Sequence, residues 1–268
     1  MKSAKTIGLL ILLSCAMAGW AQPALNELLS TAKATAEQKE EAHVRVQSFL
    51  SSIRGDSAPN QKTLRRMFHR VHNTFLKKYE AYSDFGALFS KGRFDCLTAT
   101  ALFSHLLTEM KYDFDVIETN YHIFILVKTT DGEVMLETTD RLAGFVTDPK
   151  MIARRTGDYR KNFITSRKGE QVIYNYSFSL YQKVPTEKLS GLLIYNQAVK
   201  EYNRGDWLRC ARSLEEAFDK YSTARCEELG DILLRTLMER EIAEQIKRDC
   251  LTHLKTVLMA KAGTLASN

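Results

Sequence analysis

The residues that could do nucleophilic chemistry in this chain centre on Cys96, within the stretch GRFDCLTATALF at Gly92–Phe103. Asp95 is a good helix N-cap, and apolar residues at helical spacing follow it, so Cys96 is expected in the first turn of a helix. There the backbone N–H groups are unpaired and the helix dipole favours negative charge, which biases a thiol toward the nucleophilic thiolate. The competing interpretation is that Cys96 is simply a small, buried apolar residue.

Such a cysteine needs a base within hydrogen-bond reach and a third group that orients the base. His122 begins the most apolar strand of the sequence (HIFILVK, 122–128), where its ring could reach the start of the Cys96 helix. Glu137 ends the next strand, beyond the turn at Asp131-Gly132, and is the candidate orienting carboxylate, with Asp140 as the substitute. The alternation of side chains leaves open whether the histidine and the carboxylate share a face.

At three blocks the chain resembles the transglutaminase-like superfamily of papain-like cysteine enzymes: FDCLTATALFSHLL, YHIFILV and GEVMLETTD. The resemblance covers residues 62–145. It implies Cys96 as nucleophile, His122 as base and Glu137 as orienting acid, although the family usually has Asp-Pro-Thr at the third block and often a tryptophan after the histidine, where this chain has Ile123-Phe124. We expect the thiolate to attack a carbonyl carbon and the backbone N–H of Cys96 to bind the oxyanion of the resulting tetrahedral intermediate, which then collapses to a thioester.

A second oxyanion donor is expected from residues upstream of the cysteine. The candidates are Asn73, Tyr79 and Tyr82. The spacing of cysteines and histidines matches no metal motif, and no calcium-loop pattern is present, so we expect neither a metal nor another cofactor.

The elements expected to position these residues make an α+β fold with a helical N-terminal part, a nucleophile helix packed on an antiparallel sheet, and C-terminal helical hairpins. Helices are predicted over 24–53 and 61–81, with a short helix from Asp84 to Phe89. Strands are predicted over 114–119, 122–128, 133–138 and 171–181. Residues 139–163 are expected to be mainly loop, with a short helix after Asp148-Pro149.

From about residue 186 the sequence is helical again, in four amphipathic segments over 190–204, 206–221, 224–241 and 243–261. Within the first two, small residues and a Gly205-Asp206 turn match one tetratricopeptide repeat. A single repeat does not stabilise itself, so it is expected to pack on the upstream domain. The predicted domains are therefore a transglutaminase-like domain over 22–184 and a tetratricopeptide-like region over 185–268.

The first 21 residues have the pattern of a secretory signal peptide: two lysines, an apolar run over 7–18, and Gly19-Trp20-Ala21 before the cleavage point. The alternative is a lipoprotein box ending at Cys15. Cleavage removes Lys2 and Lys5 and lowers the formal charge from +6 to +4. No other segment is long and apolar enough to span a membrane, and the mature chain is expected to be periplasmic or secreted.

Four cysteines remain after cleavage, and one disulfide among Cys210, Cys226 and Cys250 is compatible with export. Basic residues form no stripe with aromatic residues, so nucleic acid is not an expected partner. Two functions remain open. The first is an exported cysteine-dependent amide hydrolase or acyltransferase acting on a peptide, protein or cell-wall amide. The alternative is a silent scaffold that binds a protein or peptide through its C-terminal helices.

Overall fold

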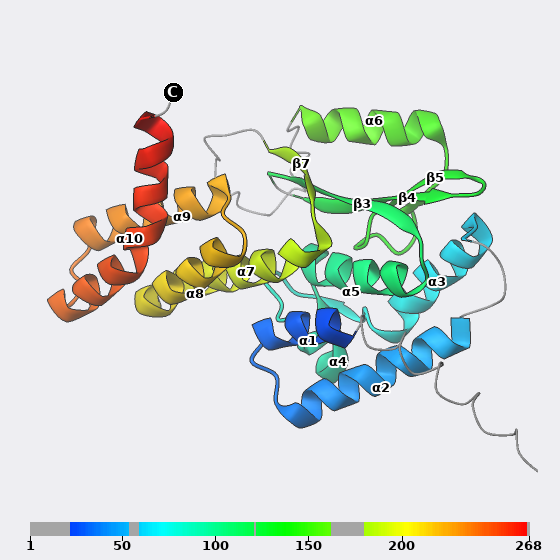
Figure 1. The fold of residues 1–268 in the computed structure, drawn as a ribbon, viewed down its shortest axis with the longest axis horizontal. Helices are drawn as coiled ribbons and strands as arrows, with labels where there is room; N and C mark the ends of the chain where they lie inside the picture. The colour runs from blue at the N-terminus through cyan, green and yellow to red at the C-terminus, as the bar shows by residue number, and fades with distance from the viewer. Residues whose placement is uncertain (1–21, 54–58, 121, 162–179, 267–268) are drawn as a thin grey trace, which may run out of the picture.

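The computed structural model describes residues 22–53, 59–120, 122–161 and 180–266 (Figure 1). The predicted signal peptide, the lipoprotein box and most of the predicted strand 171–181 lie outside these residues. The described part is a mixed α+β fold, as the sequence predicted. The helices are α1 (Gln22–Thr31), α2 (Ala36–Ile53), α3 (Gln61–Thr74), α4 (Ala87–Lys91), α5 (Cys96–Glu109), α6 (Pro149–Arg160), α7 (Leu189–Asn203), α8 (Trp207–Lys220), α9 (Ala224–Glu239) and α10 (Glu244–Ala266), with a short 3-10 turn at Thr186–Lys188.

One five-stranded antiparallel sheet lies at the centre, in the order β6-β5-β4-β3-β7. Its strands are β3 (Asp113–Thr119), β4 (Ile123–Thr129), β5 (Gly132–Leu136), β6 (Phe145–Val146) and β7 (Tyr181–Val184). The turn at Asp131-Gly132 joins β4 to β5, as predicted, with Thr129 opposite Gly132. A separate short parallel pair joins β1 (Lys78–Tyr79) to β2 (Arg93–Phe94).

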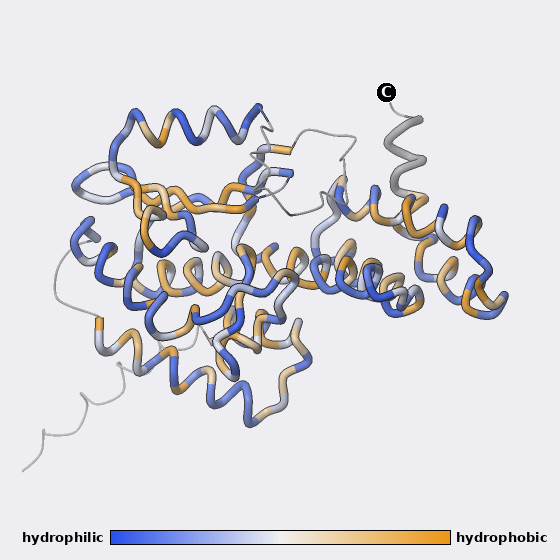
Figure 2. Tube along the Cα trace, turned by 180° about the vertical axis from the view of Figure 1, so that it is seen from behind, coloured by the Kyte–Doolittle hydropathy of each residue, from blue (hydrophilic) through white to orange (hydrophobic). Residues whose placement is uncertain are grey.

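The sheet is the middle of three layers, with α6 on one face and α5 on the other (Figure 1). Alternate residues along β4 follow this division: Ile123, Ile125 and Val127 pack into the large core with α5, whereas Phe124 packs into a smaller cluster with Ile152 of α6. Burial on both faces explains why the central strands are almost continuously apolar (Figure 2).

The predicted helix over 24–53 is wrong in one respect, because it is broken into α1 and α2. Lys33 adopts a left-handed conformation with φ +53°, and Thr35 starts the second helix with a capping box. The Thr35 hydroxyl accepts the N–H of Gln38 at 3.3 Å, and the Gln38 side chain accepts the N–H of Thr35 at 2.9 Å. The capping box at Thr35 therefore starts a new helix, although apolar residues continue at helical spacing across the break.

The predicted helix over 61–81 is also too long, since α3 ends at Thr74. The N–H groups of Lys77 and Lys78 both donate to the carbonyl of Gly92, at 2.8 and 3.0 Å, and the chain continues as β1. The strand pairing beside the segment that leads to Cys96 therefore replaces the last turns of the expected helix.

The region 139–163, expected to be mainly loop, contains β6 and the twelve-residue helix α6. The predicted start of that helix is confirmed, because the Asp148 side chain accepts the N–H of Lys150 at 2.8 Å and Pro149 occupies the first turn. The short apolar face of the helix, with Ile152 buried against the sheet, explains why the periodicity was weak.

The four C-terminal helices agree with the predicted segments. Ala198, Cys210 and Ala217 are fully buried where α7 and α8 pack together, and Gly205 makes the turn with φ +75°. The first half of α7 belongs to the large core through Leu189 and Leu192, whereas its second half belongs to a separate helical cluster. The helix α7 thus connects the two cores.

Gly144 should not tolerate a side chain, because a Cβ there would lie 2.2 Å from the carbonyl oxygen of Asp140 and 2.3 Å from that of Glu137. Both obstacles are backbone, so Gly144→Ala should lower the free energy of unfolding by about 1–3 kcal/mol. Gly157→Ala is the matched control in α6, where a Cβ meets nothing within 4 Å. It should raise stability by about 0.5–1 kcal/mol through helix propensity. Urea unfolding measures both, and equal effects would contradict the packing argument.

Candidate active site

Cys96 is the first residue of α5 and is partly exposed, as the sequence predicted for the helix start. Asp95 is the N-cap and accepts the N–H of Thr98 at 2.7 Å, while the Thr98 hydroxyl accepts the N–H of Asp95 at 2.8 Å. This reciprocal capping box fixes the first turn. It leaves the N–H of Cys96 among the helix-end donors that have no intrahelical acceptor.

The Asp95 carboxylate also holds this helix end against two other segments. Its Oδ2 accepts the N–H of Ser83 and the side-chain amide of Asn196 on α7, each at 3.1 Å. The side chain is only 2% exposed. Burial raises the pKa of Asp95, and the hydrogen bonds from Thr98, Ser83 and Asn196 oppose that effect.

His122 and Glu137 face each other at one end of the sheet. His122 immediately precedes β4, and Glu137 immediately follows β5. Since Ile125 pairs with Leu136, continuing the register places His122 and Glu137 diagonally on the same face, which settles the alternation left open by the sequence. Nε2 of the imidazole is hydrogen-bonded to Oε2 of Glu137. The side chain of Glu137 is 6% exposed, and that of His122 is 20% exposed.

Cys96 lies close enough to the imidazole to act on the pKa of His122. Burial acts to lower the pKa of His122, but the hydrogen bonds and charges of Cys96 and Glu137 together outweigh burial and raise this pKa to about 10. An imidazole offers two nitrogens and can therefore contact a carboxylate and a thiol at once. The structure thus brings Cys96, His122 and Glu137 together, with His122 hydrogen-bonded to Glu137 and Cys96 beside the imidazole.

Asp140, the substitute for Glu137, makes different contacts. Its Oδ1 accepts the N–H of Leu142 at 3.0 Å and that of Ala143 at 2.8 Å, so it closes the turn after β5. Glu137 is therefore the carboxylate that contacts His122.

Tyr159 of α6 is a part of the site that sequence reasoning missed. Its hydroxyl donates to Oε1 of Glu137 at 2.9 Å, and its ring centre lies 5.3 Å from that of His122. Burial and the charge of Glu137 raise the pKa of Tyr159, so the hydroxyl stays a donor. Both carboxylate oxygens of Glu137 are thereby occupied. No sequence signal pointed to Tyr159, because only the start of α6 was expected.

Thr138 is a second missed residue and ties the sheet to the cysteine helix. Its hydroxyl lies 3.4 Å from the carbonyl oxygen of Cys96, to which it donates, and 3.1 Å from the hydroxyl of Thr100. Because Thr138 follows Glu137 directly, these contacts hold the carboxylate and the start of α5 at a fixed separation. Only the tertiary structure shows this relation.

The three candidates for a second oxyanion donor have contacts elsewhere. Tyr79 lies edge-on to Phe94 with ring centres 5.9 Å apart, and Tyr82 packs against the C-terminal helical cluster. The backbone carbonyl of Asn73 accepts a hydrogen bond from Lys77. The N–H groups at the start of α5 remain the candidate donors at the thiol.

Other titratable groups in the core are suited to packing. Burial lowers the pKa of His72 and of His105 to about 4, so both are neutral near pH 7. Cys210, Cys226 and Cys250 are buried free thiols, so the disulfide suggested among them is not formed. Burial raises the pKa of each of the three, to about 11 for Cys226.

Two searches of the described residues concern metals and membranes. Among them, no group of three or more His, Cys, Asp or Glu side chains is arranged to hold a metal ion. Within the same ranges, no helix combines the length and apolar character needed to cross a bilayer.

Comparisons with known proteins find no matching family model and no matching curated protein. Among solved structures, the chain is similar to menin, in a crystal structure described as revealing the binding site for the Mixed Lineage Leukemia (MLL) protein. The TM-score is 0.37 and the sequence identity 13%, over 91% of this chain. The chain spans 62% of the length of that menin chain.

Asp95→Asn should destabilise the protein even though asparagine is as good an N-cap as aspartate. The new amide group would face two donors, the N–H of Ser83 and the amide of Asn196, where Oδ2 now accepts from both. We expect a loss of about 1–3 kcal/mol in the free energy of unfolding. Adding Asn196→Asp should restore part of this loss, because the amide could then donate to the new carboxylate. Urea unfolding of the single and double variants measures the coupling, and additive losses would contradict it.

The raised pKa of His122 should make stability depend on pH. A folded-state pKa of about 10, above the ordinary value of 6.5, gives stabilisation that is complete below pH 6.5 and is lost as the pH rises toward 10. Unfolding free energies at pH 6 and pH 9.5 should therefore differ more in the wild type than in His122→Gln. Cys96→Ala, which removes one of the two partners, should give an intermediate difference. An unchanged difference in His122→Gln would rule out this source of stability.

Proposed function

We propose that the protein is an exported, cysteine-dependent amide hydrolase or acyltransferase with a transglutaminase-like, papain-like core. The observation that carries the proposal is the arrangement of Cys96, at the start of α5, beside an imidazole that is hydrogen-bonded to Glu137. Cys96 stands at a helix N-terminus, His122 contacts it, and Glu137 orients the imidazole. These are the three positions that nucleophilic cysteine chemistry requires, in the chain order of the resembling superfamily.

In the proposed reaction, the thiolate of Cys96 attacks the carbonyl carbon of an amide and forms a C–S bond. The carbonyl oxygen becomes an oxyanion, which the N–H groups at the start of α5 can bind. The tetrahedral intermediate collapses as the C–N bond breaks, and the imidazolium of His122 gives its proton to the leaving amine. The products of this half-reaction are a thioester on Cys96 and a neutral imidazole.

In the second half-reaction, His122 removes a proton from water or from an acceptor amine as that molecule attacks the thioester carbonyl. The C–S bond breaks, the thiolate is released, and His122 is again an imidazolium. Water gives a carboxylic acid and an amine gives a new amide. Throughout, Glu137 stabilises the charged imidazole, and the Tyr159 hydroxyl fills the other oxygen of that carboxylate.

The proposed substrates are amides of a peptide, a protein or the cell wall, which are the amides available to an exported enzyme. The mild positive charge and the absence of a basic, aromatic-rich stripe in the sequence argue against nucleic acid as a partner. The proposed acid–base chemistry uses only side chains of this chain, and we propose no cofactor.

The first test is alkylation of the full chain with iodoacetamide at pH 6, with the sites mapped by mass spectrometry. Cys96 should react about tenfold or more faster than a free cysteine, because only the thiolate reacts and an ordinary thiol is almost fully protonated at that pH. His122→Ala should remove most of this difference. The three buried thiols at Cys210, Cys226 and Cys250 serve as internal controls and should react only on unfolding.

The second test traps the thioester. Hydroxylamine is added to the protein with a mixture of synthetic peptides, and hydroxamic acids are measured by mass spectrometry. The wild type should form them and Cys96→Ala should not. If Cys96 reacts at the rate of a free cysteine and both proteins give the same product, the enzyme proposal is wrong. The alternative would then be a scaffold that binds a partner through its C-terminal helices.

A further inference from the structure

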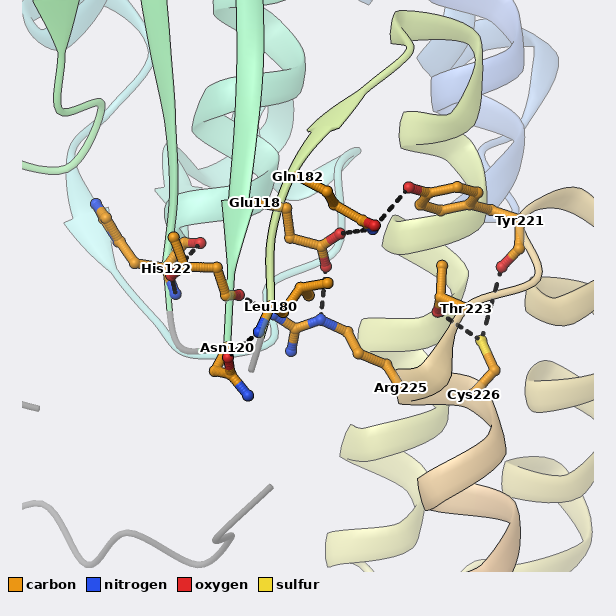
Figure 3. Close-up of polar contacts among 10 residues, drawn as sticks. Glu118, Asn120, His122, Leu180, Gln182, Tyr221, Thr223, Arg225 and Cys226 are labelled. Carbon is orange, nitrogen blue, oxygen red and sulfur yellow. Dashed lines mark hydrogen bonds and ion pairs between the residues drawn. The ribbon is translucent and has the colours of Figure 1, made fainter. Parts of the chain in front are cut away.

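We infer that Arg225 of α9 is a positioning residue for His122, so that the C-terminal helices complete the candidate active site. The inference rests on the proposed function, because it concerns the same histidine. Arg225 lies 103 positions from His122 in the sequence, and nothing in the sequence joins the two. In the structure, it reaches from the first turn of α9 to the end of β3, beside the turn that carries the histidine (Figure 3).

Arg225 is held in place by a buried ion pair. Its Nε lies 2.5 Å from Oε1 of Glu118, and the two side chains are 10% and 4% exposed. The second carboxylate oxygen of Glu118 accepts a hydrogen bond from Gln182 at 3.1 Å, and Gln182 also contacts the Tyr221 hydroxyl at 2.9 Å (Figure 3). The Nε–H of Arg225 is not aligned as a hydrogen bond to this carboxylate, so the two residues are joined as an ion pair, while the other oxygen of Glu118 is held by Gln182.

The Nη2 end of the same guanidinium reaches the end of β3, where the chain turns toward β4. This turn contains Thr119, Asn120 and His122, and we call it the histidine turn. The Nη2 group donates to the backbone carbonyl of Thr119. Thr119 in turn holds His122 by three hydrogen bonds: its N–H donates to the carbonyl of His122 at 2.8 Å, its hydroxyl donates to the same carbonyl at 3.1 Å, and that hydroxyl accepts the N–H of His122 at 3.1 Å. One residue therefore links α9 to the backbone of His122.

The forked shape of the guanidinium suits this double task. Arginine can bind a carboxylate with one N–H and a carbonyl with another, whereas lysine offers a single point charge. The same histidine turn is closed on its other side by Asn120, whose side-chain carbonyl accepts the N–H of Leu180 at 2.5 Å. The turn is thus held between β7 and α9, and its geometry depends on both.

A parallel contact reaches the cysteine. Asn196 of α7 donates to Asp95, the residue directly before Cys96. The nucleophile candidate and the base candidate are therefore each held by a different C-terminal helix, α7 for Cys96 and α9 for His122. The part of the chain that looks like a separate helical region in the sequence contributes to the alignment of both groups.

The test uses the double variant Arg225→Met/Glu118→Met in the full chain. Replacing both charges avoids an unpaired buried carboxylate, and such replacements are often nearly neutral for stability. The variant should keep its unfolding midpoint but lose the contact with Thr119. The rate of Cys96 alkylation at pH 6 should fall by about tenfold or more. A tenfold fall is the change expected when the apparent pKa for forming the reactive Cys96–His122 pair rises by one unit. The pH profile of alkylation should move to higher pH.

Lys220→Met is the matched control. Lys220 of α8 pairs with Glu27 of α1 at 3.1 Å, so it also joins the C-terminal helices to the N-terminal part, and this ion pair contacts neither Asp95 nor Thr119. Its loss should leave the alkylation profile of Cys96 unchanged. Arg225→Lys, which keeps the charge beside Glu118 but lacks the second arm, should lower the rate as the double variant does, and it decides the question if the double variant does not fold.

The outcomes separate this inference from the proposed function. If wild-type Cys96 is not reactive at pH 6, the proposed function fails. If wild-type Cys96 is reactive and the Arg225 variants keep both its rate and its pH profile, Arg225 has only a structural role and the inference is overturned. A readout on the histidine itself is the imidazole chemical shift of His122, followed against pH by NMR. It should move in the Arg225 variants and stay fixed in Lys220→Met.

Discussion

The buried carboxylate of Asp95 is the contact on which the candidate site most depends. A carboxylate that is 2% exposed is stable only when its oxygens are hydrogen-bonded, and its partners come from three places: Thr98 in its own helix, Ser83 before α4, and Asn196 on α7. The first turn of α5 is therefore completed only when all three segments have assembled. The orientation of the Cys96 side chain therefore depends on the packing of these three segments and not on α5 alone.

His122 and Glu137 are likewise held by contacts from other segments of the chain. His122 and Glu137 stand just beyond the ends of neighbouring strands, where helices add further contacts to those of the sheet. Thr138 connects to α5, Tyr159 contacts Glu137 from α6, and Arg225 holds the histidine turn from α9. Helices α5, α6 and α9 thus each supply one contact that supports a group of three side chains.

The parts of the fold that sequence could predict are those with local signals. Asp95 as N-cap, the Asp131-Gly132 hairpin and the four C-terminal helices depend on neighbouring residues, and all are present. The break at Lys33 was missed because helical spacing continues across it. The β1 strand was missed because its partner is distant in sequence. The choice between Glu137 and Asp140 needed the strand register, and Tyr159, Thr138 and Arg225 needed the packing of whole layers.

The three buried thiols have a consequence for how this chain must fold. Disulfides form by attack of an accessible thiolate, and Cys210, Cys226 and Cys250 are protected from it only after α8, α9 and α10 have packed together. Before that moment these three thiols are as accessible to oxidation as Cys96. In an oxidising compartment, the helical region would therefore have to fold faster than its thiols are oxidised. A chain that folded more slowly would form non-native disulfides.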